Sequence, residues 1–188
     1  MPFFVIKGRF KPAVGIPDGD SVLFQANMPA LWNKLGGTPV RLGTSDKSKN
    51  TAQLRLEGID AIKKKATQLL ATDAKKNMFK LISHTTAKPE PEGYVLARMT
   101  DDKSGRPISF VFASKTSLTD GSEVKLTPAI LKVSVNYKQL RDGYAYPLYY
   151  NTIFGDLRNE FNIKRCGPQA TAAHVCSLAD GLRRYVDG

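Results

Sequence analysis

The hydrophobic pattern of the chain predicts short strands that are interrupted by helices. Between residues 53 and 57, polar and apolar side chains alternate, which places Leu54 and Leu56 on one face. This period of two predicts a half-buried strand. Gly58 allows the strand to bend or bulge, so Asp60 is expected at its end. Four further runs have strand character: 3–10, 21–24, 94–99 and 108–112.

Helical spacing marks four segments. Residues 66–82 repeat apolar side chains every three or four positions, with no interrupting Gly or Pro. Residues 134–142 form a shorter predicted helix, with Ser134 as its N-cap. Two more helices are expected at 152–161 and 178–186. Periodicity alone therefore indicates an α+β fold, and 188 residues suffice for one domain with a substantial core.

The charge balance narrows the choice of partners. The chain has 28 Lys and Arg residues against 17 Asp and Glu residues, which gives a net charge of +11. Such an excess attracts polyanions, with nucleic acid as the leading candidate and an anionic membrane surface as the lesser one. A generally basic soluble protein is the alternative. No segment approaches a membrane span and no signal peptide is evident, so we expect no membrane partner, and a cytoplasmic location if residue 1 is the native start.

The two cysteines lie close together near the C-terminus. Cys166, His174 and Cys176 do not match the spacing of a common zinc site. A disulfide between the two thiols requires an oxidising compartment. Two ordinary thiols are the favoured expectation.

Three short motifs bring charged residues to the expected ends of strands. Residues 18–22 (Asp-Gly-Asp-Ser-Val) place Asp20 at a strand start, and residues 55–60 read Arg-Leu-Glu-Gly-Ile-Asp. Residues 102–106 (Asp-Lys-Ser-Gly-Arg) lie at the turn of a hairpin. A guanidinium and a carboxylate placed in this way suit a site that handles phosphate and a cation together. In this order, the motifs resemble the staphylococcal nuclease (thermonuclease) family over most of residues 16–161, as a divergent member.

The resemblance implies a five-stranded OB-type Greek-key β-barrel with about three α-helices, in a single domain that spans residues 1–188. Against the family pattern, the chain has insertions near 27–50 and 114–133 and a C-terminal extension from about residue 164. Trp32 lies in the first insertion. Its ring could stack on a base, but packing against the barrel is the favoured expectation.

The resemblance also implies a calcium-dependent phosphodiesterase, an endonuclease that acts on DNA or RNA. The metal ligands would be Asp20, Asp60 and the backbone carbonyl of Ala61, while Arg55 and Arg106 would hold the phosphate. These roles agree with chemistry, because calcium prefers oxygen ligands. Arginine offers a planar fork of donors that matches phosphate oxygens.

Three further residues are expected beside the bound nucleic acid, with single strands as the favoured form. Lys103 matches a substrate-side lysine of the hairpin turn, and Tyr149 falls where the family has a tyrosine near the nucleotide. Lys63 occupies the position of the family's water-activating glutamate. A protonated lysine cannot act as a base unless its pKa is strongly depressed. Because the loss of a general base costs about 10²–10⁴-fold in rate, hydrolysis is expected to be weak.

Glu57 is the tentative substitute base. It lies two residues from Arg55, so on a regular strand both side chains share a face. The alternative is a surface glutamate paired with a nearby lysine. The loss of the family's glutamate also leaves a wider alternative open, a non-catalytic nucleic-acid-binding OB-fold module. A protein-interaction scaffold would explain the insertions, but not the charged residues of the three motifs.

Overall fold

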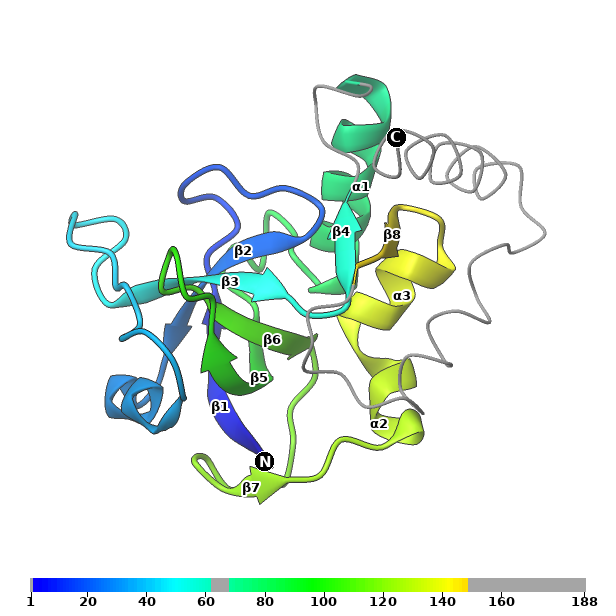
Figure 1. Cartoon of the computed structure of the whole chain (residues 1–188). Coiled ribbons are helices and arrows are strands. Elements are labelled where there is room, and N and C mark those ends of the chain that lie inside the picture. The colour runs from blue at the N-terminus through cyan, green and yellow to red at the C-terminus, as the bar shows by residue number, and fades with distance from the viewer. Residues whose placement is uncertain (1, 62–67, 149–188) are drawn as a thin grey trace, which may run out of the picture.

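The computed structural model describes residues 2–61 and 68–148, and its centre is a closed five-stranded mixed β-barrel (Figure 1). The strands pair in the order β1-β2-β3-β6-β5, and β5 pairs with β1 to close the ring. The β3–β6 pair is parallel and the others are antiparallel. This arrangement confirms the α+β class and is consistent with an OB-type barrel. The strands are β1 Phe3–Phe10, β2 Ser21–Ala26, β3 Thr51–Leu56, β5 Glu92–Thr100 and β6 Pro107–Phe112.

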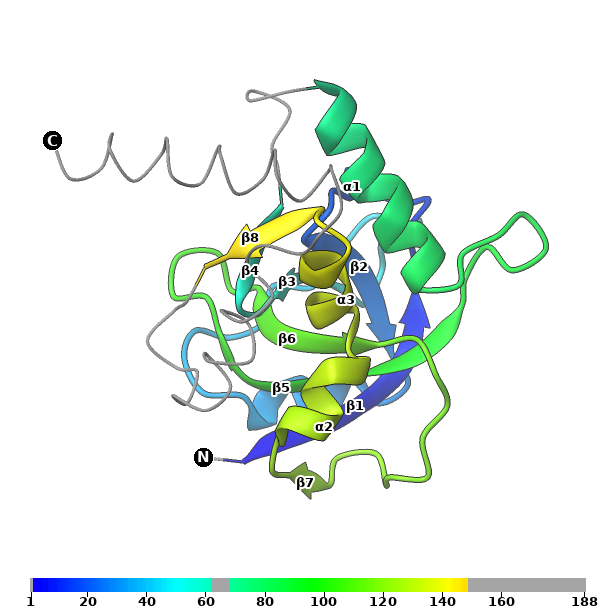
Figure 2. The ribbon, with the colours of Figure 1, turned by 90° about the vertical axis from the view of Figure 1, so that its right-hand side faces the viewer.

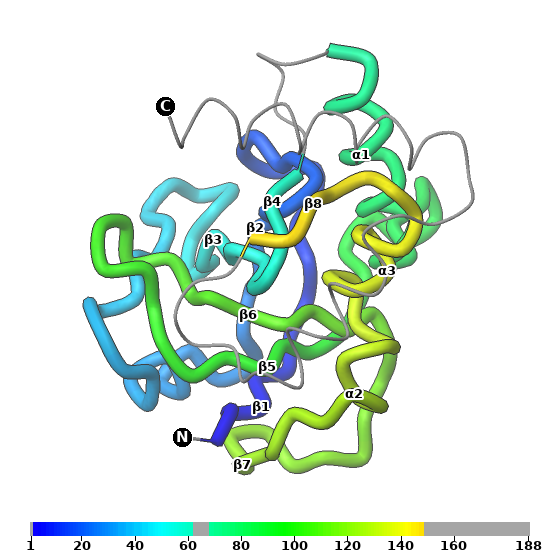
Figure 3. The backbone as a smooth tube through the Cα atoms, turned by 45° about the vertical axis from the view of Figure 1, so that its right-hand side comes forward, coloured from blue at the N-terminus to red at the C-terminus, as the bar shows by residue number. Residues whose placement is uncertain are grey.

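A second, two-stranded sheet lies at one end of the barrel. It pairs β4, Ile59–Ala61, with β8, Ala145–Pro147. Figures 2 and 3 show this pair close to α1, Gln68–Leu81, and α3, Val135–Arg141. Among the described residues, none of the helices is both long and apolar enough to cross a membrane. The remaining elements are the 3-10 helix η1 Pro29–Lys34, strand β7 Glu123–Val124 and helix α2 Pro128–Val133.

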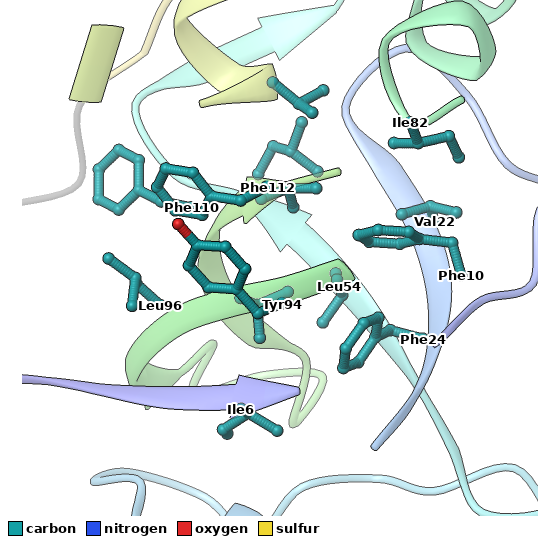
Figure 4. Close-up of a cluster of buried hydrophobic side chains, with 14 of the residues drawn as sticks. Ile6, Phe10, Val22, Phe24, Leu54, Ile82, Tyr94, Leu96, Phe110 and Phe112 are labelled. Atoms are coloured by element: carbon teal, nitrogen blue, oxygen red, sulfur yellow. The ribbon is translucent and has the colours of Figure 1, made fainter. Parts of the chain in front are cut away.

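Aromatic and branched side chains fill the barrel interior and also cover the outer face of β5 and β6. The register places Phe10 and Phe24 inside the barrel, whereas Tyr94 and Phe112 lie on the outer face, on the same side as Lys7. Figure 4 shows the rings of Phe10, Phe24, Tyr94 and Phe112 among the buried aliphatic residues. Phe10 lies 5.1 Å from Phe24, and Tyr94 stacks on Phe112 at 4.6 Å, measured between ring centroids. Every residue of β6 is buried, because α3 packs on this strand on the outside of the barrel. The burial of a ring in such a core is worth about 1.5–3 kcal/mol, so the barrel is a firm support for side chains at its rim.

Most of the expected elements are present where the structure describes them. The strand expectations are confirmed, and the helix expected at 66–82 covers Gln68–Leu81. Ser134 caps α3 as expected, because its hydroxyl accepts a hydrogen bond from the backbone N–H of Tyr137. Trp32 is buried and meets Phe24 edge-on at 6.3 Å, so the packing expectation is confirmed. The helices expected at 152–161 and 178–186 lie outside the described residues.

Two details of the central strand differ from expectation. Strand β3 ends at Leu56, and Gly58 then takes a φ of +78°, a backbone conformation that favours glycine. The chain turns there and starts β4, so Asp60 lies in the middle of β4 rather than at the end of β3. The outer face of the strand is also less exposed than a half-buried strand implies. Gln53 is exposed, but Arg55 and Glu57 are buried.

Candidate active site

The turn after β3 brings three of the expected site residues together at the barrel end. Asp20 immediately precedes β2, whose Ser21 is paired with Arg55 on β3. The backbone N–H of Leu56 donates to the Asp20 carbonyl at 2.9 Å. Strand β4 then carries Asp60 back toward Asp20, and the N–H of Ala61 donates to Asp20 Oδ2 at 3.1 Å. The predicted approach of the two aspartates is thus a product of the β3–β4 turn.

The two carboxyl groups are buried and hydrogen-bonded to each other. Burial is the largest cause of a raised pKa at Asp20, which reaches about 8, and the hydrogen bond to Asp60 adds to it. Asp18 raises this pKa further through its own hydrogen bond and its charge, while the backbone N–H of Ala61 lowers it. Two carboxylates so close cannot both ionise without a compensating positive charge. The pair therefore holds a proton near neutral pH, and a bound cation would replace it.

Arg55 supplies part of the positive charge. Its Nη2 lies 3.5 Å from Asp60 Oδ1, and the arginine is only 8% exposed. An arginine remains charged at any working pH. The carboxylate pair therefore has a fixed guanidinium on one side, as a site for a phosphate group requires.

Tyr146 is a site residue that the sequence analysis did not identify. It is paired directly with Asp60 across the β4–β8 sheet, and its hydroxyl donates to Asp60 Oδ2 at 2.5 Å. Burial first, and then Asp60, raise the pKa of the Tyr146 hydroxyl above its usual range, so it remains a donor. The sequence shows a cluster of tyrosines at 144–150, but a three-residue strand gives too weak a pattern to indicate which one faces Asp60.

Helix α3 holds both acid-bearing segments in place. Gln139 donates from Nε2 to the carbonyl of Gly19 at 2.7 Å and to that of Ala74 at 3.0 Å. Asn136 donates to the carbonyls of Glu57 and Ser109, both at 2.9 Å. Both side chains are fully buried. Their spacing of three residues on a predicted helix was the available signal, since it puts two amides on one face.

The hairpin residues Arg106 and Lys103 lie farther along the sheet. Arg106 donates from Nε to Ser104 Oγ at 2.8 Å, and its Nη2 lies 3.2 Å from Asp101 Oδ2. Burial acts to raise the pKa of Asp101, but the hydrogen bonds that it accepts from the backbone N–H of Lys103, from Arg106 and from Ser104 outweigh burial and lower that pKa. Lys103 is exposed at the turn. Within the described residues, the ionic partner of Arg106 is thus Asp101, not the Asp20–Asp60 pair.

Glu57 occupies a different environment from the one expected. It is 3% exposed, so the alternative of a surface glutamate is wrong. Its charge acts on Arg98, whose pKa is lowered by burial and raised again by Glu57. Arg98 lies 4.7 Å from the centre of the Phe3 ring. The role of Glu57 as a base remains a prediction, and Lys63 and Tyr149 lie outside the described residues.

The oxygen donors around the Asp20–Asp60 pair match the ligand preference of a calcium ion. In the part of the chain that the structure describes, no cluster of three or more His, Cys, Asp or Glu side chains suits a metal. Among the described residues, Asp20 and Asp60 would thus be its side-chain ligands, with the Ala61 carbonyl as a third donor. All three donors are oxygens, which suit calcium, and a divalent ion would relieve the repulsion between the carboxylates. The residues therefore fit the ion, with most of its coordination left to water and substrate.

Comparisons with known proteins assign no family. A scan against protein-family models gives no match, and a search of curated proteins gives none either.

Proposed function

We propose that this protein is a calcium-dependent phosphodiesterase that cleaves DNA or RNA at the Asp20–Asp60 pair, as a divergent relative of the staphylococcal nuclease family. The observation that carries the proposal is the pair of buried, mutually hydrogen-bonded carboxyl groups beside the Arg55 guanidinium. Burial of two acids in contact is unfavourable for stability, since each resists desolvation and repels the other. Such a pair makes sense when its task is to hold a cation.

The two aspartates and their neighbour Tyr146 have different roles. Asp20, Asp60 and the Ala61 carbonyl would hold the ion, which supplies Lewis-acid activation of the phosphate when bound. Tyr146 donates to Asp60 and so fixes the orientation of that carboxylate. Carboxylates that bind metals depend on such outer partners for affinity.

The arginines act on the substrate. Arg55, held by Asp60, would bind the phosphate and offset the charge that develops on it during cleavage. Arg106 can turn the donors that Asp101 and Ser104 leave unused toward the same backbone. Lys103 at the exposed turn adds a phosphate contact on the way to the site. The net charge of +11 draws the polyanion to this surface.

Water activation is the weak point of the proposed chemistry. Lys63 stands where a glutamate would serve as base, and Glu57 is already engaged electrostatically with Arg98. We therefore expect slow turnover, with Glu57→Gln as the test of whether this residue supports the reaction. Loss of residual cleavage with unchanged DNA affinity would assign the base to Glu57. Unchanged cleavage would exclude it.

A non-catalytic nucleic-acid-binding module is the second candidate, and one observation favours it. Both carboxylate oxygens of Asp60 already have partners, Tyr146 on Oδ2 and Arg55 on Oδ1. Part of the charge of the pair is thus offset without a cation. In that case, Asp20 and Asp60 serve to position Arg55 for phosphate binding alone.

One assay separates the two candidates. Single-stranded DNA and RNA are incubated with the wild-type protein and Asp60→Asn, each in calcium and in a chelator. If the protein is a nuclease, the wild type should cleave in calcium, whereas Asp60→Asn and the reactions with chelator should show no cleavage. Lys63→Glu should accelerate the cleavage, because it restores a carboxylate. Tight binding without cleavage, in wild type and in Lys63→Glu alike, would overturn the proposed hydrolysis in favour of the binding module.

A further inference from the structure

An open cleft lies on the barrel surface beside the proposed active site. Its volume is about 420 Å³, and its lining includes two arginines and no acidic residue. The arginines are Arg41, from the 27–50 segment, and Arg106, from the β5–β6 turn. The apolar part comes from Val14, Leu23 and Leu42, and the rest is polar and uncharged. A groove with positive and apolar sides suits an anionic ligand that also has flat or apolar groups.

Strand register connects this cleft to the carboxylate pair. Gln53 lines the cleft and lies two residues before Arg55 on β3, so the two side chains share one face. Two residues along a strand span about 6.6 Å. The same two-residue spacing holds on β2, where Leu23 pairs with Gln53 and Ser21 pairs with Arg55. If one phosphate of a nucleic-acid strand lies at Arg55, the neighbouring nucleotides of that strand would therefore lie in the cleft.

The wall that carries Arg41 is fixed to the hairpin that carries Arg106. The backbone N–H of Arg41 donates to the Gly105 carbonyl at 3.0 Å, and Thr38 donates from Oγ1 to the Asp102 carbonyl at 3.1 Å. Gly105 has a φ of +64°, and an added Cβ would lie 2.7 Å from the carbonyl oxygen of Pro39. Only glycine permits this close approach. Hydrogen bonds thus join the two segments that bring arginines to this groove.

The two arginines differ in how they are engaged. Arg106 uses donors on Ser104 and Asp101, so part of its charge is already offset. Arg41 is exposed, and among the described residues it has no ionic partner. Arg41 is therefore the residue of the cleft with most of its binding capacity left for an external anion.

We infer that this cleft is a second binding site for the sugar-phosphate backbone of single-stranded nucleic acid, with Arg41 as its principal phosphate ligand and Leu23 and Val14 as the surface under a base or sugar. The inference rests on the proposed function, because the strand must continue from the phosphate at Arg55. It assigns a role to the 27–50 segment, which both braces the hairpin and extends the contact with substrate. It also predicts that the protein favours oligonucleotides over single nucleotides.

The test measures binding of labelled single-stranded oligonucleotides of increasing length in a chelator, where cleavage is absent. Arg41→Ala should weaken binding of a long oligonucleotide about tenfold. It should also reduce the salt slope by about 0.7, the effect of one lost phosphate contact. Gln53→Glu, which places a negative charge in the cleft, should weaken binding in the same way. A dinucleotide has a single phosphate, which lies at Arg55 and leaves none for the cleft, so Arg41→Ala should not weaken its binding.

The matched control is Arg9→Ala. It removes the same charge from an exposed arginine on β1 that pairs with Glu92 and does not line the cleft. If Arg41→Ala behaves like Arg9→Ala, or weakens the dinucleotide as much as the long oligonucleotide, the inference is wrong. Competition by polyglutamate as effective as that by the oligonucleotide would show a general anion site instead. Calcium-dependent cleavage is measured separately. If Arg41→Ala weakens binding but no protein cleaves, the proposed hydrolysis is wrong and the binding cleft stands.

Discussion

The carboxylate site and the arginine cleft share strands β2 and β3 but are built in opposite ways. At the barrel end, Asp20, Asp60 and Arg55 are buried, and side-chain amides of α3 hold the segments that carry them. In the cleft, Arg41 is exposed and Arg106 half-buried, and backbone hydrogen bonds fix the supporting loops. Low exposure strengthens electrostatic interactions and imposes an exact geometry. High exposure gives attraction that salt can weaken.

This difference indicates a division of labour. Under the proposed function, the buried end would act on one phosphate, and the exposed cleft would hold the rest of the strand. Substitutions in the first region should therefore alter cleavage and stability, whereas substitutions in the second should alter affinity and its salt dependence.

The largest expected effect is a dependence of stability on pH that belongs to Asp20. Its pKa is raised to about 8 in the folded protein, so the neutral form favours folding. That stability is fully present below the unfolded pKa of 3.8 and is lost as the pH rises through about 8. In a chelator, the free energy of unfolding of the wild type should fall relative to that of Asp20→Asn between pH 4 and 9. The relative loss should approach about 5 kcal/mol. Parallel pH profiles from urea unfolding would contradict the burial of a shared proton.

The second effect concerns cleavage at Asp60. Asp60→Ala should lower calcium-dependent cleavage of single-stranded DNA by about 10²–10³-fold, since it removes a cation ligand and the partner of Arg55. Its affinity for the DNA in a chelator should remain near that of the wild type. Arg41→Ala should show the reverse, with lower affinity and little change in cleavage at saturating substrate. Equal effects of both variants on both quantities would remove the distinction between the two regions.

The third effect is structural. Gln139→Leu leaves the carbonyls of Gly19 and Ala74 without their donor in a buried site. It should lower the free energy of unfolding by about 2–4 kcal/mol. The control is Lys138→Ala on the same helix, which is half-buried and should change stability little. Thermal or urea unfolding measures both. Equal stability of the two variants would show that the α3 amide does not hold the Asp20 segment.

The smallest effect is that of Tyr146. Tyr146→Phe removes the hydrogen bond to Asp60 Oδ2 and keeps the ring in place. Calcium affinity should fall by about 10–100-fold, as for other outer partners of metal ligands. Tyr144→Phe on the preceding turn is the control. An increase in calcium affinity would instead show that the tyrosine competes with the ion for Asp60.

The sequence predicted the barrel strands from local alternation, and it predicted the approach of Asp20 to Asp60 from the resemblance of the three motifs to the staphylococcal nuclease family. Alternation marks β3, and Gly58 marks the point at which the chain turns back. The sequence did not indicate Tyr146 as a site residue, because its position depends on the pairing of two three-residue strands that are far apart in sequence. Burial of Glu57 depends on Arg98 and α3, which no local pattern connects to it.

The sequence did not indicate Arg41 for a similar reason. It lies in a polar segment whose placement depends on backbone hydrogen bonds to the β5–β6 turn. Sequence periodicity has no signal for such contacts, so a residue in a long connection cannot be assigned to a site in advance. The strands of the barrel were thus predictable, while the residues that tune the site came from tertiary contacts.

The most direct test of the carboxylate site is a calcium titration followed by calorimetry, with wild type, Asp20→Asn and Arg41→Ala compared at pH 7.5 or so. The wild type and Arg41→Ala should bind one calcium ion with similar affinity, because Arg41 belongs to the cleft and not to the cation site. Asp20→Asn should lose that binding, since it removes one of two side-chain ligands. Absence of calcium binding by the wild type, or equal binding by Asp20→Asn, would contradict a cation site at the Asp20–Asp60 pair.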